Sequence, residues 1–182
     1  MIPQRITTAI ILFFFFGGLA SCSPPVKNND YLVSFIDTTK DEYGYKKQNG
    51  DIAIPLGKYS FCFTDTFRTF AIVAKPELGF VAIDRQENVL YKVFPFDNGP
   101  DNSSNGFFRI IENNKIGFAD SATGKIIIKP QFDCAFPFEN GLAKVSTNCN
   151  IQQEGEHYRW VSDNWYYIDK SGKKVDKSVA PK

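Results

Sequence analysis

The chain has 182 residues, which is enough for one globular domain with a substantial core and too few for two generous ones. Its 21 basic and 20 acidic residues give a formal net charge of +1, so no charged field favours nucleic acid as a partner. Eighteen Phe, eight Tyr and two Trp, with one Met and one His, favour β-structure. We therefore expect one strand-rich domain.

Residues 1–21 have the pattern of a bacterial secretory signal peptide. Arg5 precedes the apolar block Ala9–Ala20, which contains four consecutive phenylalanines. A membrane-spanning helix needs roughly 20 apolar residues, whereas this block is shorter and contains two glycines. The sequence therefore predicts a cleaved signal rather than a membrane span.

The tetrad Leu19-Ala20-Ser21-Cys22 has the form of a lipobox, in which the cysteine thiol receives a diacylglyceryl group before cleavage. Several acyl chains, such as palmitate, on Cys22 would anchor the protein stably to a membrane, because each buried CH₂ contributes about 0.8 kcal/mol. Ordinary cleavage beside an unmodified cysteine is the alternative. Residues 22–30, polar and proline-bearing, would form a tether to a single domain at 31–182. Because Ser23, rather than an acidic residue, immediately follows Cys22, we prefer the outer membrane of the cell envelope, with its periplasmic and surface faces both open.

Four segments of the domain align with one another, at about 43–73, 78–111, 115–145 and 164–175. The copy at 115–145 is the clearest: two short strands flank a turn ending in Gly124, and a third strand, Leu142–Val145, follows a second turn. In this alignment Gly117 matches Gly79 and Gly44. The last copy is a truncated hairpin, as expected of a capping repeat.

The third strands provide an internal test of the repeat. Two apolar columns run through them, and the column between holds Ile72, Arg109 and Lys144. The apolar columns are Ala71, Phe108 and Ala143, and then Val73, Ile110 and Val145. Alternation in register across copies indicates that the apolar columns face a common core. We expect an all-β array of antiparallel three-strand units, propeller-like or solenoid-like, with Tyr31–Ile36 and Trp165–Val175 covering its two ends.

Four motifs of the third copy strongly resemble the bacterial WG-repeat family. They are Gly117-Phe118, the turn 120–124, Ile128-Lys129-Pro130-Gln131-Phe132 and the segment 137–145. The resemblance covers about Tyr43–Val175, although Ile116-Gly117, Leu78-Gly79 and Tyr43-Gly44 replace the family's Trp-Gly pair. It implies repeated β-hairpin units, often on secreted or lipid-anchored proteins suspected of binding, and it brings no catalytic residues or cofactors.

Catalytic chemistry is poorly represented. The one histidine, His157, lies in a polar stretch and is expected on the surface. Asp84, Asp120 and Asp169 recur just before turns, where capping of backbone N–H groups explains them better than a metal site. We expect neither an enzyme nor a metal or cofactor site.

Besides Cys22, the chain has Cys62, Cys134 and Cys149, which allow one internal disulfide and leave one thiol. Cys134 and Cys149 are closest in sequence and are the preferred pair, while free buried cysteines are the alternative, especially for Cys62.

Two Phe-Pro-Phe segments, Phe94–Phe96 and Phe136–Phe138, are expected mainly in the core, with exposed stacking platforms as the alternative. The leading functional hypothesis is a non-catalytic, lipid-anchored envelope module that binds or scaffolds a protein partner. The alternative is binding of envelope polysaccharide by four exposed aromatics, Tyr158, Trp160, Trp165 and Tyr166; a hydrolase is a distant third. Specificity is expected where the copies disagree, at Pro100–Asn105 and Thr147–Asn164.

Overall fold

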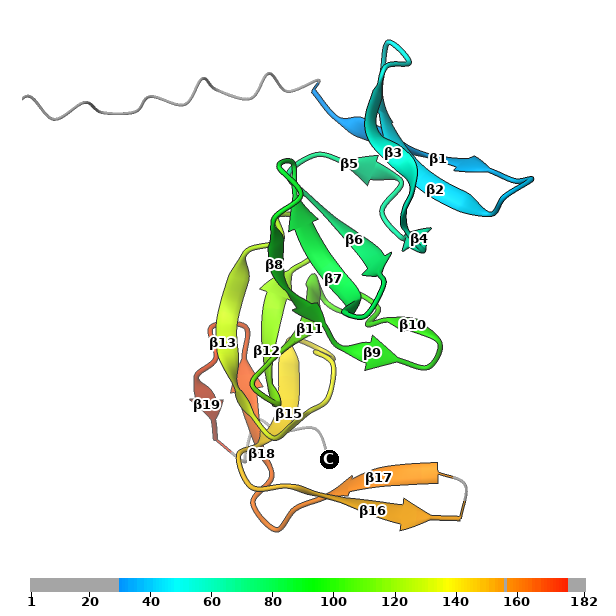
Figure 1. Cartoon of the computed structure of the whole chain (residues 1–182). Helices are drawn as coiled ribbons and strands as arrows, with labels where there is room; N and C mark the ends of the chain where they lie inside the picture. The colour runs from blue at the N-terminus through cyan, green and yellow to red at the C-terminus, as the bar shows by residue number, and fades with distance from the viewer. Residues whose placement is uncertain (1–29, 156, 177–182) are drawn as a thin grey trace, which may run out of the picture.

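The computed structural model describes residues 30–155 and 157–176, and this part of the chain is all-β (Figure 1). The signal peptide and Cys22 lie outside the described residues. The longer strands form four antiparallel three-stranded units, which confirms the expected repeat fold. The units are β1 (Leu32–Asp37), β2 (Glu42–Lys47) and β3 (Ile52–Tyr59); β6 (Phe70–Lys75), β7 (Gly79–Asp84) and β8 (Val89–Val93); β11 (Phe107–Glu112), β12 (Lys115–Asp120) and β13 (Ile126–Phe132); and β15 (Leu142–Ser146), β18 (Tyr166–Asp169) and β19 (Lys174–Val175).

Short strands connect and extend these units. They are β4 (Phe61–Cys62), β5 (Thr66–Phe67), β9 (Pro95–Phe96), β10 (Gly99–Pro100) and β14 (Cys134–Ala135). A separate hairpin, β16 (Asn150–Glu154) and β17 (His157–Val161), projects from the fourth unit (Figure 1). Within the described residues no helix is long and apolar enough to cross a membrane.

The structural unit is one strand out of phase with the sequence repeat. The third strand of each sequence copy pairs with the hairpin of the next copy: β6 with β7, β11 with β12, and β15 with β18. Strand β1 supplies the equivalent strand for the first hairpin by pairing with β2. The expected end strand near Tyr31–Ile36 therefore completes the first unit, and β3 remains at the sheet edge.

The array is open. The second and third units join through Ile110 and Val93 into a seven-stranded sheet of order β13-β12-β11-β8-β7-β6-β4. Among the described strands, none of the first unit pairs with any of the fourth, and the two units lie at opposite ends of the row in Figure 1. Of the two expected arrangements, the structure has the solenoid-like one.

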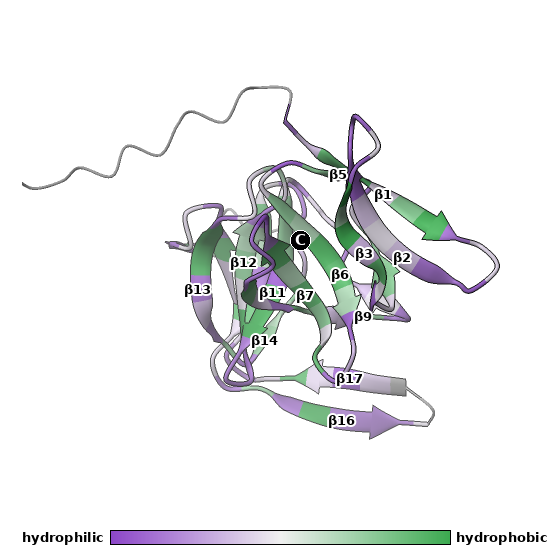
Figure 2. Cartoon of the chain, turned by 45° about the horizontal axis from the view of Figure 1, so that its top comes forward, coloured by the Kyte–Doolittle hydropathy of each residue, from purple (hydrophilic) through white to green (hydrophobic). Residues whose placement is uncertain are grey.

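Both apolar columns of the third strands are buried, as expected. All six side chains are at most 3% exposed. They belong to three core clusters, which lie between the first and second units, the second and third units, and the third and fourth units. Figure 2 shows strands of this core such as β6 and β7 as hydrophobic and most turns as hydrophilic. The column between the two apolar columns faces away from the core. Its members Ile72 and Lys144 are accordingly half-buried, but Arg109 is buried.

Gly44 and Gly117 permit a close approach of two strands. A Cβ on Gly117 would lie 2.5 Å from the carbonyl oxygen of Ile128, and one on Gly44 would lie 2.6 Å from that of Ile54. At both places the pairing with the next strand shifts register, as in a β-bulge. Matching Gly79 to these glycines was wrong. Gly117 pairs with Ile110, and the equivalent partner of Val73 in the second unit is Val81, so Val81 occupies the position of Gly117. Gly79 instead begins its strand directly after a turn.

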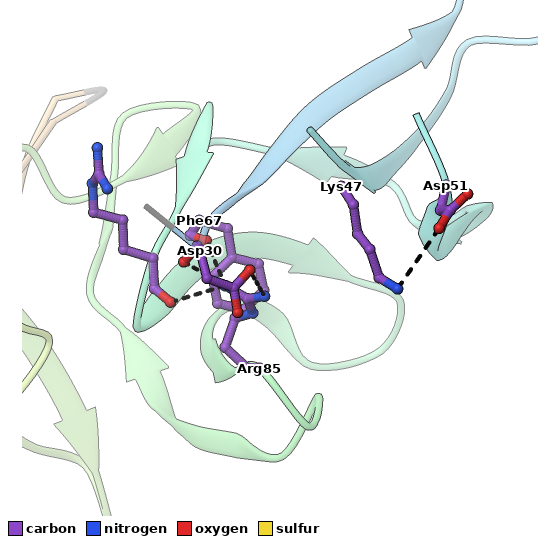
Figure 3. Close-up of polar contacts among 6 residues, drawn as sticks. Asp30, Lys47, Asp51, Phe67 and Arg85 are labelled. Carbon is purple, nitrogen blue, oxygen red and sulfur yellow. Dashed lines mark hydrogen bonds and ion pairs between the residues drawn. The ribbon is translucent and has the colours of Figure 1, made fainter. Parts of the chain in front are cut away.

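Arg85, in the turn after β7, fastens the start of the described chain to the second unit (Figure 3). Its Nη1 donates to the carbonyl oxygens of Asp30, Phe67 and Arg68, each at 3.3 Å, and its Nη2 lies 3.3 Å from Asp30 Oδ1. The guanidinium also lies 5.7 Å from the centre of the Phe67 ring. The point where the chain enters the domain is thereby fixed against the core.

Candidate functional site

Three phenylalanines occupy equivalent positions beside the third strands. Each donates its backbone N–H to a carbonyl oxygen of the column that faces away from the core. The pairs, donor first, are Phe63 and Ile72 at 2.9 Å, Phe94 and Arg109 at 3.0 Å, and Phe136 and Lys144 at 2.9 Å. The repeat therefore places an aromatic ring at the same point on the outer face of three successive units.

Around Phe94 and Phe136 these rings join a larger group, which we call the aromatic row: Phe96, Phe94, Trp160, Phe136 and Trp165. The Trp160 ring lies between Phe94 and Phe136, with centroid distances of 5.9 and 5.4 Å. Trp165 lies 5.4 Å from Phe136 on its other side. Phe96 and Phe136 are 54% and 42% exposed, so the row presents apolar surface to solvent.

Two cations belong to the aromatic row. The Arg109 guanidinium lies 4.1 Å from the centre of the Phe94 ring and 5.7 Å from that of Phe96. Lys144 Nζ lies 5.1 Å from the Trp165 ring centre and 5.9 Å from that of Phe136. Such contacts orient the rings and contribute roughly 0.5–2 kcal/mol each, depending on how far the cation is removed from water.

Arg109 is buried because the segment Pro100–Asn105 covers it. Asp101 of this segment accepts hydrogen bonds from Arg109 Nε at 3.0 Å and from its backbone N–H at 2.8 Å, and pairs with Nη2. Arg109 Nη1 donates to the carbonyl oxygen of Ala135 at 3.1 Å. The ion pair fastens the segment Pro100–Asn105 to β11 of the third unit, a role that the strand alternation did not reveal.

Two grooves flank the segment Pro100–Asn105. One, of about 500 Å³, is lined by Phe63, Ile72, Phe96 and residues 97–103. The other, of about 520 Å³, runs beside Phe136 and is lined by polar and charged groups as well as rings: Ser104, Glu139, Lys144 and Tyr167. The segment expected to carry specificity therefore forms a wall of both grooves.

The four aromatics expected to bind a ligand do not share one environment. Trp160 and Trp165 lie in the aromatic row, but both are half-buried rather than exposed. Tyr166 is also half-buried, 6.4 Å from Phe132 in the core, and burial raises the pKa of its hydroxyl. Only Tyr158, on the projecting hairpin, is well exposed, at 71%. The expectation of four exposed rings was therefore wrong for three of them.

The Phe-Pro-Phe segments also divide. Phe138 is buried against Phe107 and Phe118, and Phe94 is half-buried, as expected of core residues. Phe96 and Phe136 are exposed, so the core expectation was wrong for them. Proline prevents regular pairing in both segments, which lets one phenylalanine of each turn outward. The repetition of Phe63, in Phe61-Cys62-Phe63, at the same position as Phe94 and Phe136 was the available signal for this face.

A disulfide joins Cys134 of β14 to Cys149, with 5.9 Å between their Cα atoms. Nearby, Ser162 Oγ donates to the carbonyl oxygen of Asn148 at 2.6 Å, across the base of the β16–β17 hairpin. These links fix the base of the hairpin and so help to seat Trp160 in the aromatic row. Cys62 is free and buried, and burial raises the pKa of its thiol to about 11.

The repeated aspartates cap turns, as expected. Asp84, Asp120 and Asp169 each accept backbone N–H bonds from the residues that follow, for example from Thr123 to Asp120 Oδ1 at 2.7 Å. Hydrogen bonds from the side chains of Asn88, Thr123 and Ser171 hold the pKa values of these carboxyls below their usual range. Across residues 30–155 and 157–176, no group of three or more His, Cys, Asp or Glu side chains could hold a metal ion. The side chain of His157 lies outside the described structure.

The fold and its outer face define a β-repeat protein of stacked three-stranded units. A family model described as "WG containing repeat" matches residues 116–148, which span β12 to the turn after β15. Residues 116–148 therefore match a WG repeat, at the copy whose motifs predicted one. No curated protein and no solved structure matches the chain.

Proposed function

We propose that this protein is a non-catalytic, lipid-anchored binding or scaffold module of the bacterial cell envelope, and that it engages a protein partner through the aromatic row. The observation that carries the proposal is the row itself: five rings on the outer face, two of them well exposed, with a cation beside each end. Exposed aromatic clusters of this kind are frequent centres of binding energy between proteins.

The geometry of the rings supports a protein rather than a polysaccharide. Trp160 meets Phe94 and Phe136 edge to face, at 77° and 74°, so the rings do not form one flat platform. The exposed members, Phe96 and Phe136, carry no hydrogen-bonding group. Apolar side chains of a partner could pack between such rings, and the rim charges Lys144 and Glu139 would contribute orientation.

Envelope polysaccharide remains the second candidate because of the groove beside Phe136. Ser104, Glu139, Lys144 and Tyr167 line this groove and supply donors and acceptors suited to hydroxyl groups. The exposed ring of Tyr158 lies on the hairpin and does not line this groove. If the ligand is a glycan, a short segment of it would therefore bind in this groove, and the four aromatics named from the sequence would not bind it together.

The lipobox at Leu19–Cys22 supports anchoring through Cys22, with the outer membrane preferred. From Cys22 to Asp30 the chain could extend at most about 30 Å, at roughly 3.3–3.6 Å per residue. In Figure 1 the described chain begins beside β5, whereas the β16–β17 hairpin, which contributes Trp160, lies at the other end of the molecule. The tether would therefore join the domain at the end opposite the β16–β17 hairpin.

The test uses the full mature protein, solubilised in detergent, to capture partners from solubilised envelope. Phe96→Ser and Phe136→Ser should each reduce retention of a specific protein at least tenfold while the domain stays folded, with a loss of stability of about 1–2 kcal/mol from the missing ring contacts. Ile52→Ser is the matched control, because Ile52 is 63% exposed but lies on β3 of the first unit. Equal retention by all variants would contradict the proposal. Binding of purified envelope polysaccharide in place of a protein would favour the second candidate.

Anchoring is tested separately by Cys22→Ala. The wild-type protein should incorporate a labelled fatty acid and sediment with membranes, whereas the variant should do neither. A variant that still sediments with membranes and incorporates label would show that Cys22 is not the anchor.

A further inference from the structure

The β16–β17 hairpin is the one long two-stranded element among the described residues. Its strands pair with each other from Asn150–Val161 to Glu154–His157 and with no other described strand. All five residues of β16 are exposed. In Figures 1 and 2 β16 lies on the outer side of β17, away from the body of the molecule. The open edge of β16 is therefore accessible to another chain.

Other edges of this protein are protected in ways that β16 is not. The long edge strands β3 and β13 contain Pro55 and Pro130, and the remaining edge strands of the large sheets have two residues each. Proline and short length both discourage pairing between molecules. Strand β16 reads Asn150-Ile151-Gln152-Gln153-Glu154, with neither a proline nor a lysine, and its only charge is at the end next to the hairpin turn.

One face of the hairpin also leaves two large apolar side chains exposed. Ile151 pairs with Trp160, and Gln153 with Tyr158, so these four side chains share a face. Trp160 packs into the aromatic row, but Ile151 and Tyr158 are 67% and 71% exposed. An isolated two-stranded hairpin is marginally stable in water, and additional strands stabilise it.

We propose that β16 pairs with β16 of a second copy of this chain, antiparallel and about a two-fold axis at Gln152, to give a four-stranded sheet. This register pairs all five residues of each strand. It places Gln152 opposite Gln152 of the second copy, Ile151 opposite Gln153, and Asn150 opposite Glu154. No like charges face each other, and the exposed Ile151 side chains of both copies come to one face of the new sheet.

The charges of β17 disfavour the alternative edge. Pairing of β17 with its own copy about its central residue would place Arg159 opposite Arg159, and like charges in directly opposite positions destabilise a sheet. In the β16 arrangement Arg159 stays beside Glu154 of its own hairpin, where Nε lies 3.3 Å from the carboxylate. Self-complementarity of β16 is what favours a second copy over an unrelated strand.

The register can be tested by cysteine cross-linking of the full mature chain in detergent. Gln152→Cys places two thiols on the axis, where opposite Cβ atoms lie about 4.5–5.5 Å apart, whereas Gln153→Cys places each thiol opposite Ile151. Under mild oxidation, Gln152→Cys should form at least tenfold more covalent dimer than Gln153→Cys or the wild type, which retains buried Cys62. Equal cross-linking of the two variants would overturn the register.

Sedimentation measures the association itself. The wild type should dimerise reversibly, Gln152→Lys should weaken the dimer several-fold by placing like charges on the axis, and Gln153→Lys should have the smaller effect. Phe96→Ser, which alters the aromatic row but not the hairpin, should leave the dimer intact, so failure of the proposed function would not be mistaken for failure of this inference. A wild-type protein that stays monomeric at high concentration would overturn the proposal. A wild-type protein that binds a strand of another protein but not its own copy would overturn it as well.

Discussion

Asp101 and Arg109 form a buried ion pair in which both oxygens of the carboxylate contact the guanidinium, and each side chain is at most 4% exposed. Asp101 belongs to the segment Pro100–Asn105, which forms a wall of both grooves beside the aromatic row. The geometry of the pair therefore links the stability of the middle of the array to the shape of the candidate site.

Asp101→Ala should be strongly destabilising, because it leaves the guanidinium of Arg109 buried without its partner. Removal of one member of a buried pair costs about 3–5 kcal/mol. Urea unfolding would measure the loss. Asn102→Ala, at the exposed neighbouring position, should cost about 0.5 kcal/mol or less, as surface substitutions usually do. Equal effects of the two changes would show that the pair does not support the fold.

Val145→Asp and Lys144→Asp test the alternation of β15. Val145 is fully buried, so a carboxylate there should cost more than about 4 kcal/mol and unfold the domain. Lys144 faces the aromatic row, and its replacement should cost about 1 kcal/mol through the lost contacts with Phe136 and Trp165. Thermal unfolding followed by circular dichroism separates the two outcomes, and similar melting temperatures would contradict the register.

Gly117→Ala tests the close approach of β12 and β13. A methyl group would meet backbone atoms of Ile128, Lys129 and Pro130 at 2.5–2.9 Å, so the strands must separate, and we expect a loss of about 2 kcal/mol or more. Gly99→Ala is the matched control, because the same methyl would have no neighbour within 4 Å and the glycine has no positive φ. A Gly117→Ala variant as stable as Gly99→Ala would show that the bulge adapts freely.

The turn aspartates predict an acid dependence of stability. Because their pKa values are lowered in the folded protein, their contribution is fully present above the unfolded value, near 3.9, and is lost as the pH falls through the folded values. Asp120→Asn should therefore be less stable than wild type at pH 7, and the difference should shrink as the pH falls toward 3. Urea unfolding over this range measures it, and a constant difference would contradict the assignment.

The core and the repeat were predictable because they depend on alternation and turn chemistry, which are local in sequence. Val73, Ile110 and Val145 could be assigned to the core from period-two patterns alone. The partner of each third strand was not predictable from those patterns, since a strand between two hairpins can pair with either one. The same ambiguity led to the mismatch of Gly79, because glycine in a turn and glycine under a facing backbone look alike in sequence.

The aromatic row was only partly predictable. Trp160 and Trp165 were identified as binding candidates, but their contacts with Phe136 depend on where the β16–β17 hairpin places Trp160 and where the loop before β18 places Trp165. The burial of Arg109 depends on Asp101, eight residues earlier in an insertion. A charged residue in a half-exposed column gives no sign of such a partner, because the outcome depends on tertiary packing rather than on strand period.

The shift between sequence repeat and structural unit has a consequence for how the protein is made. A chain exported behind a signal peptide emerges from the membrane with its N-terminus first, as it does from the ribosome, so β6, β11 and β15 are each available before the hairpin that pairs with them. Every new hairpin can add to an existing template instead of waiting for a later strand, and the sequence separations that must close stay short. The array can therefore grow vectorially, in the order in which its units are synthesised.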